Sequence, residues 1–193
     1  MARVAEFDRA EVLDRAMNVF WRKGFEGSSV QELVAATGIN RASMYNSFGD
    51  KEALFLAAID HYVAHVNRQR LALLEEDRPA REVIGRYFDD LVSFSSGEGR
   101  RLGCLLTNTA IELGPRNSRI DRKLAGIFDR VEASFETVIR RGQAAGDIAP
   151  DKDPAAVSRF LLCAVQGLRV LARTGTDERA LRDIVDVTLS ALD

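Results

Sequence analysis

Apolar residues recur every three or four positions along most of this 193-residue chain, which is the spacing of one face of an α-helix. Only four prolines interrupt the pattern, and strand-like alternation is not its dominant feature. The pattern therefore predicts an all-α protein of about nine helices. We expect these helices over about residues 8–23, 29–37, 41–46, 51–74, 83–94, 102–113, 118–145, 154–173 and 177–192.

Two short helices joined by a glycine turn are predicted near the start of the chain. Ser28 or Ser29 precedes an apolar pattern, and a Gln or Glu follows three residues later, as in a capping box. Gly38 stands where a helix end needs a left-handed backbone, and Asn40 is placed to cap the next helix. This arrangement is typical of a helix-turn-helix, whose second helix enters the DNA major groove.

The second of these helices carries residues suited to DNA. Arg41 can bond guanine through two hydrogen bonds, and small neighbours allow close approach to the bases. Tyr45 and Lys51 suit phosphate contacts, and Asn46 suits a phosphate or a base. The alternative is an ordinary polar surface, with Tyr45 mainly a packing residue. The candidate DNA-binding residues are Ser29, Asn40, Arg41, Ala42, Ser43, Tyr45, Asn46 and Lys51.

The stretch GINRASMYNSF at residues 38–48, followed by GDKEAL at 49–54, resembles the N-terminal signature of the TetR family of bacterial transcriptional regulators. The resemblance is dense from about Phe7 to Ala58. The later segments 103–106 and 167–173 resemble one branch of that family.

The resemblance implies a regulator that binds a palindromic operator as a homodimer. It further implies repression that an unidentified small-molecule effector relieves. We expect a helix-turn-helix head over residues 1–50 and an effector-binding and dimerisation body over residues 51–193.

Charge and composition add limits. The net charge is −2, and residues 1–51 hold as many acidic as basic side chains, so overall charge does not favour nucleic acid. The charged N-terminus predicts no signal peptide, and no apolar run is long enough to predict a membrane span. Two cysteines without metal spacing favour free thiols in a cytoplasmic protein, and we expect no cofactor.

The segments 154–173 and 177–192 are apolar on more than one side, which a small chain cannot bury alone. Two such helices from each of two subunits would form a four-helix bundle about a two-fold axis. The candidate interface residues are Phe160, Leu161, Val165, Leu168, Ile184, Val185 and Leu189.

Aromatic and polar residues of the predicted body are candidates to line an effector pocket. Thr107, Asn108 and Gln166 are the most informative, because polar groups inside a helical bundle need partners. The full set is Tyr62, His65, Phe88, Phe94, Cys104, Thr107, Asn108, Phe128, Phe135 and Gln166.

Cys104 offers an alternative form of regulation. It stands at the start of a predicted helix beside Arg100 and Arg101, and both features favour a reactive thiolate that senses oxidants or electrophiles. The bland interpretation is a small buried side chain. Cys163, within an apolar helix, is expected to be a packing residue.

Other readings of the chain have weaker support. His61 and His65 have a spacing that can hold a metal, but no further ligand is evident, so we assign no metal site. No nucleophile–base pair or phosphate loop indicates an enzyme. A protein-interaction adaptor, using the broad apolar helices for another partner, remains the rival class.

Overall fold

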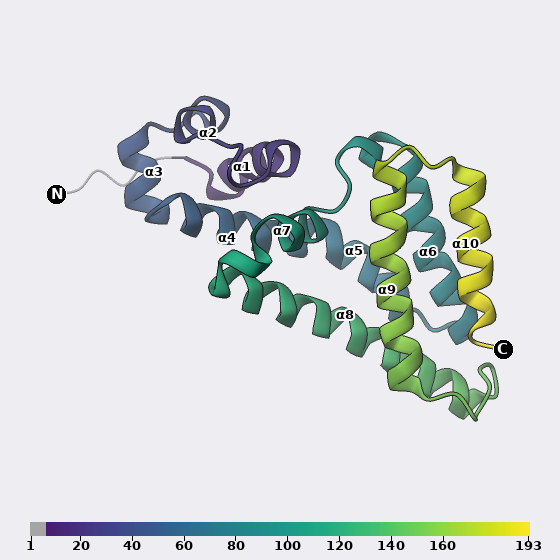
Figure 1. Ribbon diagram of the computed structural model, residues 1–193. Helices are drawn as coiled ribbons and strands as arrows, with labels where there is room; N and C mark the ends of the chain where they lie inside the picture. Colours follow the sequence, from purple (N-terminus) through teal and green to yellow (C-terminus); the bar gives the residue numbers. More distant parts are fainter. Residues whose placement is uncertain (1–6) are drawn as a thin grey trace.

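The computed structural model describes residues 7–193, apart from the side chains at positions 98, 99 and 115. All regular elements in this part of the chain are helical, which confirms the all-α prediction. Three short helices form a head at one end, and the last helices form a body at the other (Figure 1). Residues 1–6, on which the expected absence of a signal peptide rests, lie outside the described part.

The head consists of α1 (Arg9–Lys23), α2 (Val30–Thr37) and α3 (Arg41–Phe48). Side chains cap all three helices at their N-termini. Ser29 and Glu32 form a complete capping box on α2, and the Asn40 side chain accepts the Ser43 N–H at 2.8 Å on α3. These caps, predicted from the sequence, are confirmed. Gly38 ends α2 with a left-handed φ of 73°, which a side chain would disfavour.

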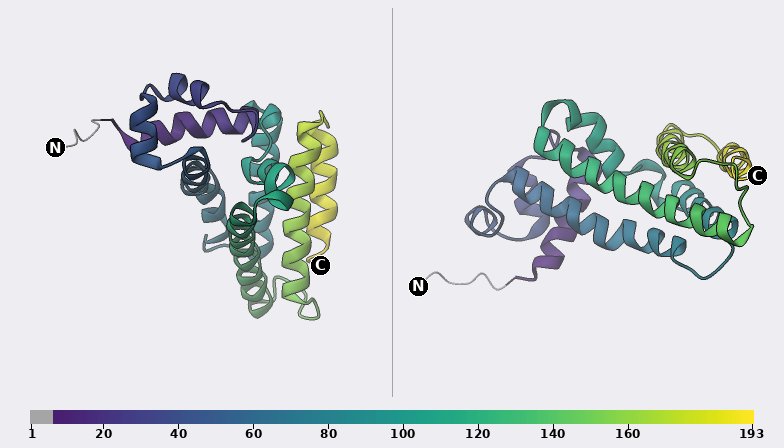
Figure 2. Two further views of the ribbon diagram at one scale, coloured as in Figure 1. Left: turned by 60° about the vertical axis from the view of Figure 1, so that its left-hand side comes forward. Right: turned by 90° about the horizontal axis from the view of Figure 1, so that it is seen from below.

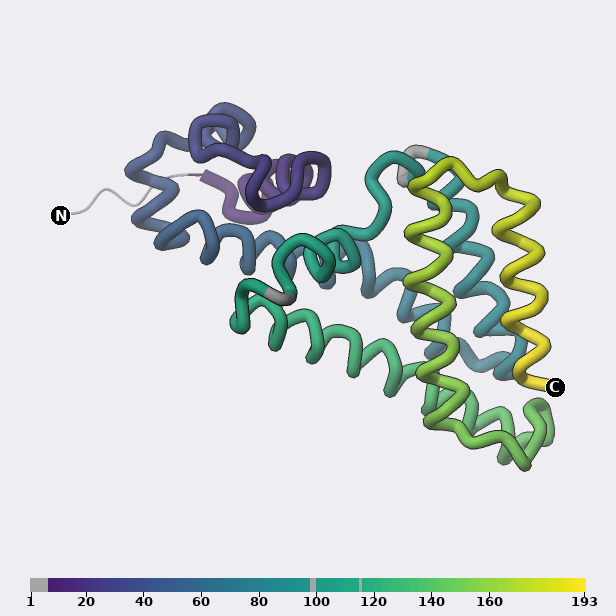
Figure 3. Tube along the Cα trace, in the orientation of Figure 1, coloured from purple at the N-terminus to yellow at the C-terminus, as the bar shows by residue number. Residues whose placement is uncertain are grey.

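A long rod leads from the head into the body. It consists of α4 (Lys51–Tyr62), the π-helical turn η1 (Val63–Asn67) and α5 (Arg68–Leu74). The trace in Figure 3 runs through these elements without a break. The predicted helix over residues 51–74 is therefore correct in extent, but the π turn was not predicted. Because a π turn holds an extra residue, it rotates the buried side of the rod.

The body contains α6 (Ala80–Ser96), η2 (Glu98–Arg101), α7 (Leu105–Leu113), η3 (Gly114–Arg116), α8 (Ser118–Ala145), α9 (Pro154–Arg173) and α10 (Glu178–Ser190). Helix α8 crosses the molecule beside the rod, and α9 packs against both α8 and α6. Helices α9 and α10 lie side by side at the outer edge of the body, seen end-on in the right-hand view of Figure 2.

Two hydrophobic clusters hold the fold together. The first is shared by α1, α2, α3, α4, α7 and the start of α8, so the core of the head continues past residue 50. The second joins α5, α6, α9 and α10 to the remainder of α8. The rod therefore belongs to both clusters and connects them mechanically.

By length and composition alone, α9 is apolar enough to cross a membrane, which the sequence reading did not anticipate. In the folded chain Leu161, Val165, Leu168 and Ala172 of this helix are core residues of the second cluster. Packing within the subunit therefore accounts for one face of α9, and its other apolar face is exposed.

Candidate nucleic-acid interface and effector cavity

Helix α3 has an inner and an outer side. Met44 and Phe48 are buried in the first cluster and anchor the helix to the head. Arg41, Ala42 and Asn46 are exposed on the outer side. The helix thus presents a long cation, an amide and a small residue together, which is the chemistry that a major-groove reader needs.

Tyr45 and Ser43 lie between these two sides, and both are half-buried. The Tyr45 ring packs against the first cluster, and the Arg41 guanidinium carbon lies 5.5 Å from the centre of that ring. Tyr45 therefore has the packing role considered above, and its ring also restrains Arg41.

The candidate residues Ser29 and Asn40 are exposed, but their side chains already serve as helix caps. At Ser29 the partner is Glu32, whose pKa is lowered to about 2 by hydrogen bonds from Lys23 and then from Ser29. The carboxylate therefore stays ionised near neutral pH. Any contact of Ser29 or Asn40 with another molecule would have to share these groups with the caps.

Two cations flank α3. The Lys51 ammonium lies 4.3 Å from the centre of the Phe25 ring, and the Arg9 guanidinium carbon lies 4.3 Å from that of Phe48. Arg9 also donates a hydrogen bond to the Ser47 carbonyl at 3.2 Å. Arg9 could be a phosphate contact or a solvated side chain by sequence alone, because no local pattern shows that the start of α1 lies against the end of α3.

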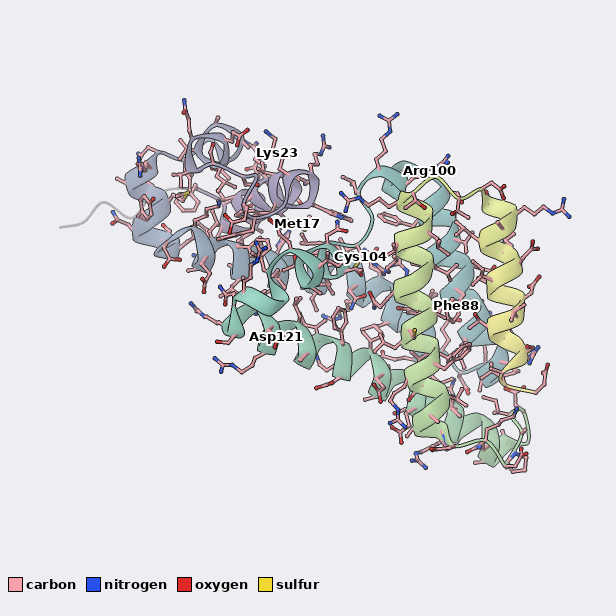
Figure 4. All side chains as sticks on the ribbon, viewed as in Figure 1. Met17, Lys23, Phe88, Arg100, Cys104 and Asp121 are labelled. Carbon is pink, nitrogen blue, oxygen red and sulfur yellow. The ribbon has the colours of Figure 1, made fainter. Side chains whose placement is uncertain are left out.

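A cavity of about 290 Å³ lies between α7 and α9. Cys104, Thr107 and Asn108, all predicted pocket residues, line it together with Arg169 and Arg173. Cys104 is at the start of α7, near α9 (Figure 4). Two more predicted residues contact this lining: Gln166 accepts a hydrogen bond from Thr107, and Tyr62 donates one to the Cys104 sulfur at 3.7 Å.

The other predicted pocket residues lie elsewhere, which corrects that part of the prediction. Phe88 and Phe135 are fully buried and stack on each other in the second cluster. Phe94 stacks on Trp21, Phe128 packs against the first cluster, and His65 is exposed. Phe88 and Phe135 belong to the hydrophobic core because α6 and α8, which carry them, pack directly against each other.

Arg169 was not among the site residues predicted from the sequence. It is only 5 % exposed, and one of its terminal nitrogens donates to the Tyr62 hydroxyl at 3.4 Å. Its Nε is buried without a hydrogen-bond partner. An arginine in an otherwise apolar helix was the available signal, because arginine is almost never fully buried unless paired.

Arg169 also changes the chemistry of Cys104. Burial raises the pKa of this thiol, but the Arg169 guanidinium, followed by hydrogen bonds from Thr107 and Tyr62, outweighs burial, so the pKa lies below its ordinary value. The expected cations, Arg100 and Arg101, are not the cause. Arg100 instead donates to the Gly175 carbonyl at 2.8 Å. The bland interpretation holds in part, because Cys104 is also a buried member of the first cluster.

Helix α7 is bonded to the head near both of its ends. The Trp21 indole donates to the Gly103 carbonyl at 3.2 Å. The Glu112 carboxylate accepts the backbone N–H groups of Phe25 and Glu26 at 3.0 and 2.8 Å. The helix that lines the cavity is therefore attached directly to the end of α1.

The predicted dimer interface needs correction. Leu161, Val165, Leu168 and Val185 are buried within their own subunit, and Ile184 and Leu189 pack partly against the same second cluster. Of the predicted set, only Phe160 is exposed, at 45 %.

A different set of apolar side chains is exposed on the last two helices. Cys163, expected to be a packing residue, is exposed, so that prediction is also wrong. The exposed stripe on α9 consists of Phe160, Cys163, Gly167, Val170 and Leu171. On α10, Val187 is 69 % exposed.

The histidine pair forms no metal cluster in residues 7–193. The rings of His61 and His65 stack with centres 4.0 Å apart, and His61 lies 3.7 Å from the Asp14 carboxylate. Burial, followed by the proximity of His65, lowers the pKa of His61. His61 therefore contacts α1 through Asp14, and His65, on η1, is exposed beside it.

A capped helix-turn-helix joined by a rod to a helical body is the architecture of a class of DNA-binding regulators. Residues 12–58 match the family model described as bacterial regulatory proteins, tetR family. Residues 80–187 match the model of the tetracyclin repressor-like C-terminal domain. The chain belongs to the TetR family of transcriptional regulators; it is a DNA-binding protein and not an enzyme.

Similar proteins include a regulator and a repressor. The uncharacterized regulator YezE of Bacillus subtilis is 34% identical over 194 residues, which cover 100% of both chains. The repressor ComR of Escherichia coli is 31% identical, with 95% of this chain and 88% of ComR covered. A solved structure of cysteine-substituted CifR with a 26-base-pair operator has a TM-score of 0.90 and 32% identity, covering 99% of this chain and 100% of CifR.

Proposed function

We propose that this protein is a homodimeric repressor that binds a palindromic operator and is released by a small-molecule effector bound in the body. The observation that carries the DNA-binding part is the outer side of α3, where Arg41, Ala42 and Asn46 are exposed over a buried anchor. The operator complex of CifR and the repressor name of ComR support the same assignment. Such a protein works in the cytoplasm, where bacterial DNA lies.

The α3 residues have distinct roles in this proposal. Arg41 and Asn46 contact base edges, and Ala42 and Ser43 permit close approach. Ser29, Asn40, Tyr45 and Lys51 contact phosphates, the first two through helix N-termini whose N–H groups attract anions. Arg9, which lies against the end of α3, adds a further phosphate contact.

Dimerisation uses the exposed side of the last two helices. Phe160, Cys163 and Gly167 recur every three or four residues on α9, so they form one stripe. Gly167 has no atom within 4 Å of the place where a Cβ would stand, so a second helix can approach closely there. A contiguous exposed apolar surface of this kind is typical of a protein–protein contact.

The mechanism follows from the geometry of the duplex. Two symmetry-related α3 helices must enter successive major grooves, roughly 34–36 Å apart. An effector that binds better to a form with another separation lowers the population that fits the operator. The rod that begins with α4 joins head to body, so it transmits the change.

A salt-titrated mobility-shift assay with duplexes selected from random DNA tests the proposal, together with light scattering for the oligomeric state. We expect a palindromic consensus, a dimeric mass and affinity that falls steeply with salt. A monomer in complex with an asymmetric site would contradict the dimer. Binding of no duplex would favour the adaptor class.

A second proposal is that Cys104 senses electrophiles or oxidants. Its lowered pKa favours the reactive thiolate, and its neighbour Gly103 is bonded to the head through Trp21. Cys104→Ser is expected to bind the operator normally and to ignore thiol reagents. Cys163→Ser is the comparison variant: it removes the other thiol, which lies on the proposed dimer stripe of α9, and it should keep the response to thiol reagents. Equal loss of operator binding by wild type and Cys104→Ser under mild oxidant would overturn this proposal.

A further inference from the structure

Arg169 carries a buried charge without an acidic partner. Among the described residues it forms no ion pair with a carboxylate, and its polar neighbours are the Tyr62 and Tyr87 hydroxyls and the Cys104 thiol. Burial raises the pKa values of both tyrosines, so they remain neutral. A buried cation that lacks a counter-charge is costly to the fold, and such groups are usually paired.

Arg169 belongs to the wall of the cavity between α7 and α9. Its Nε is buried without a partner, although more than nine-tenths of the side chain is removed from solvent. The other polar groups of the wall are satisfied. Asn108 accepts from Arg173 at 2.8 Å and donates to the Leu102 carbonyl, and Thr107 donates to Gln166.

The lining has a consistent chemical character. It contains two arginines and no carboxylate, and Ile111 and Val170 supply apolar surface. The nearest acid on the same helix, Glu112, is occupied by the N–H groups of Phe25 and Glu26. The volume of about 290 Å³ is at the lower limit of ordinary ligand pockets, so the cavity suits a small molecule.

We propose that this cavity binds a small organic anion, a short-chain carboxylate, whose charged end pairs with Arg169 and whose alkyl end lies against Ile111 and Val170. This inference rests on the proposed function, because it names the chemical class of the effector. A guanidinium is well suited to this role, since it bonds a carboxylate through two parallel hydrogen bonds.

Bound anion and Cys104 thiolate would compete for the same positive charge. Without a bound anion, the Arg169 charge stabilises the Cys104 thiolate. When a carboxylate binds, it shares or takes over that charge, and the thiolate is stabilised less. Anion binding therefore makes Cys104 less reactive. The cavity would thus respond to two signals: reversible binding of an anion and covalent modification of the Cys104 thiol.

Calorimetry on the full-length protein provides the first test, with propionate and the nearly isosteric neutral propionamide as probes. We expect propionate to bind and propionamide to bind at least about tenfold more weakly, because only the carboxylate pairs with Arg169. Equal binding of both probes, or binding of neither, would overturn the proposal. Chloride and inorganic phosphate serve as further probes, and binding of these but not of propionate would also overturn it.

Alkylation of Cys104 by iodoacetamide gives a second readout in the unmodified sequence. Saturating propionate is expected to slow the reaction roughly tenfold at neutral pH, as a rise of one pKa unit would. Propionamide is expected to leave the rate unchanged. An unchanged rate with saturating propionate would place the anion elsewhere and contradict the proposal.

Two variants locate the site. Arg169→Met keeps a long side chain but removes the charge, and we expect it to lose at least about thirtyfold in propionate affinity. Arg173→Gln removes an exposed arginine from the rim and should lose less than about threefold. If Arg169→Met does not fold, the propionamide comparison and the alkylation rates still test whether the cavity binds the carboxylate. Loss of binding by Arg173→Gln alone would overturn the assignment to Arg169.

Operator binding is measured in a separate experiment, so the proposed repressor function and the proposed anion site can each be contradicted without the other. Propionate that binds and also weakens the mobility shift supports both. Propionate that binds without changing operator affinity overturns its role as effector, and the calorimetric result still defines the anion site. Failure to bind any duplex overturns the proposed function and leaves the anion test unaffected.

Discussion

The indole of Trp21 in the head donates a hydrogen bond to the carbonyl oxygen of Gly103, the residue immediately before Cys104. The same ring stacks on Phe94 of α6 and meets Tyr62 of α4 edge-on, so the rod, the body and the segment before α7 all contact it. The residue before Cys104 is therefore hydrogen-bonded directly to α1. This contact with the head is additional to the rod that begins with α4.

Trp21→Phe should weaken this link while keeping an aromatic ring in place. We expect a loss of about 1–3 kcal/mol in the free energy of unfolding, because a hydrogen bond and some buried volume are lost. Operator affinity should change little, but its response to Cys104 alkylation should shrink. Denaturant unfolding and mobility shifts measure the two effects.

Phe94→Leu is the control for this change, since it removes a stacking partner of Trp21 and leaves the bond to Gly103. That variant should keep the full response to alkylation. An equal loss of response in both variants would assign the coupling to ring packing instead.

Gly24→Ala should be more damaging than Gly146→Ala. Both glycines have positive φ, but a Cβ on Gly24 would lie 2.6 Å from the Glu112 carboxylate, whereas Gly146 has open space. We expect about 1–2 kcal/mol for Gly146→Ala from backbone strain alone, and a larger loss for Gly24→Ala. Thermal unfolding compares them; similar losses would mean that Glu112 moves aside without cost.

Arg41→Ala should weaken operator binding by about 1–3 kcal/mol and relax the preference at one base pair, because a base contact is lost. The helical circular dichroism should be unchanged, since Arg41 is exposed. Lys51→Ala should instead reduce affinity for all duplexes alike and lower the salt slope by about one. Full-strength binding by Arg41→Ala would remove Arg41 from the interface.

Phe160→Glu should produce a monomer that remains folded, because this side chain is 45 % exposed in the isolated subunit. Leu161→Ala, one residue later, should cost about 2–5 kcal/mol of subunit stability, because Leu161 is fully buried. Light scattering and thermal unfolding separate the two effects. A dimeric Phe160→Glu protein would show that the subunits meet elsewhere.

The rate of Cys104 alkylation should depend on pH with an inflection below that of an ordinary thiol. Its pKa is lowered by Arg169 against the opposing effect of burial, so more thiolate is present at neutral pH. The rate therefore falls only when the pH drops through this lowered pKa. Arg169→Met should move the inflection of the alkylation rate to higher pH, while Tyr62 remains beside the thiol. An inflection unaffected by this substitution would exclude Arg169 as the cause.

Local interactions explain why the head was predicted well. The pairs Ser29–Glu32 and Asn40–Ser43 are three residues apart, and the backbone at Gly38 concerns a single residue. Caps and turns of this kind depend on neighbours in the chain, so the sequence alone shows them. The helix boundaries at residues 51, 118 and 154 follow for the same reason.

Neighbouring residues in the sequence do not determine which face of α9 is buried. Its residues are apolar all round, so periodicity could not tell Leu161, which faces the core, from Phe160, which faces outward. The packing of α9 against α8 and α6 decides this, and it involves contacts between distant segments. The same limit explains why Phe88 and Phe135 were assigned to a pocket and proved to be core.

The amino-acid order alone thus specifies the helices, their caps and the outward residues of α3, because each depends on residues within about one turn of one another. Tertiary packing decides the proposed regulatory chemistry. Cys104 and Arg169 belong to different helices, and only the docking of α7 against α9 brings an unpaired guanidinium to a thiol. No spacing rule connects such residues, since their proximity results from the packing of whole helices.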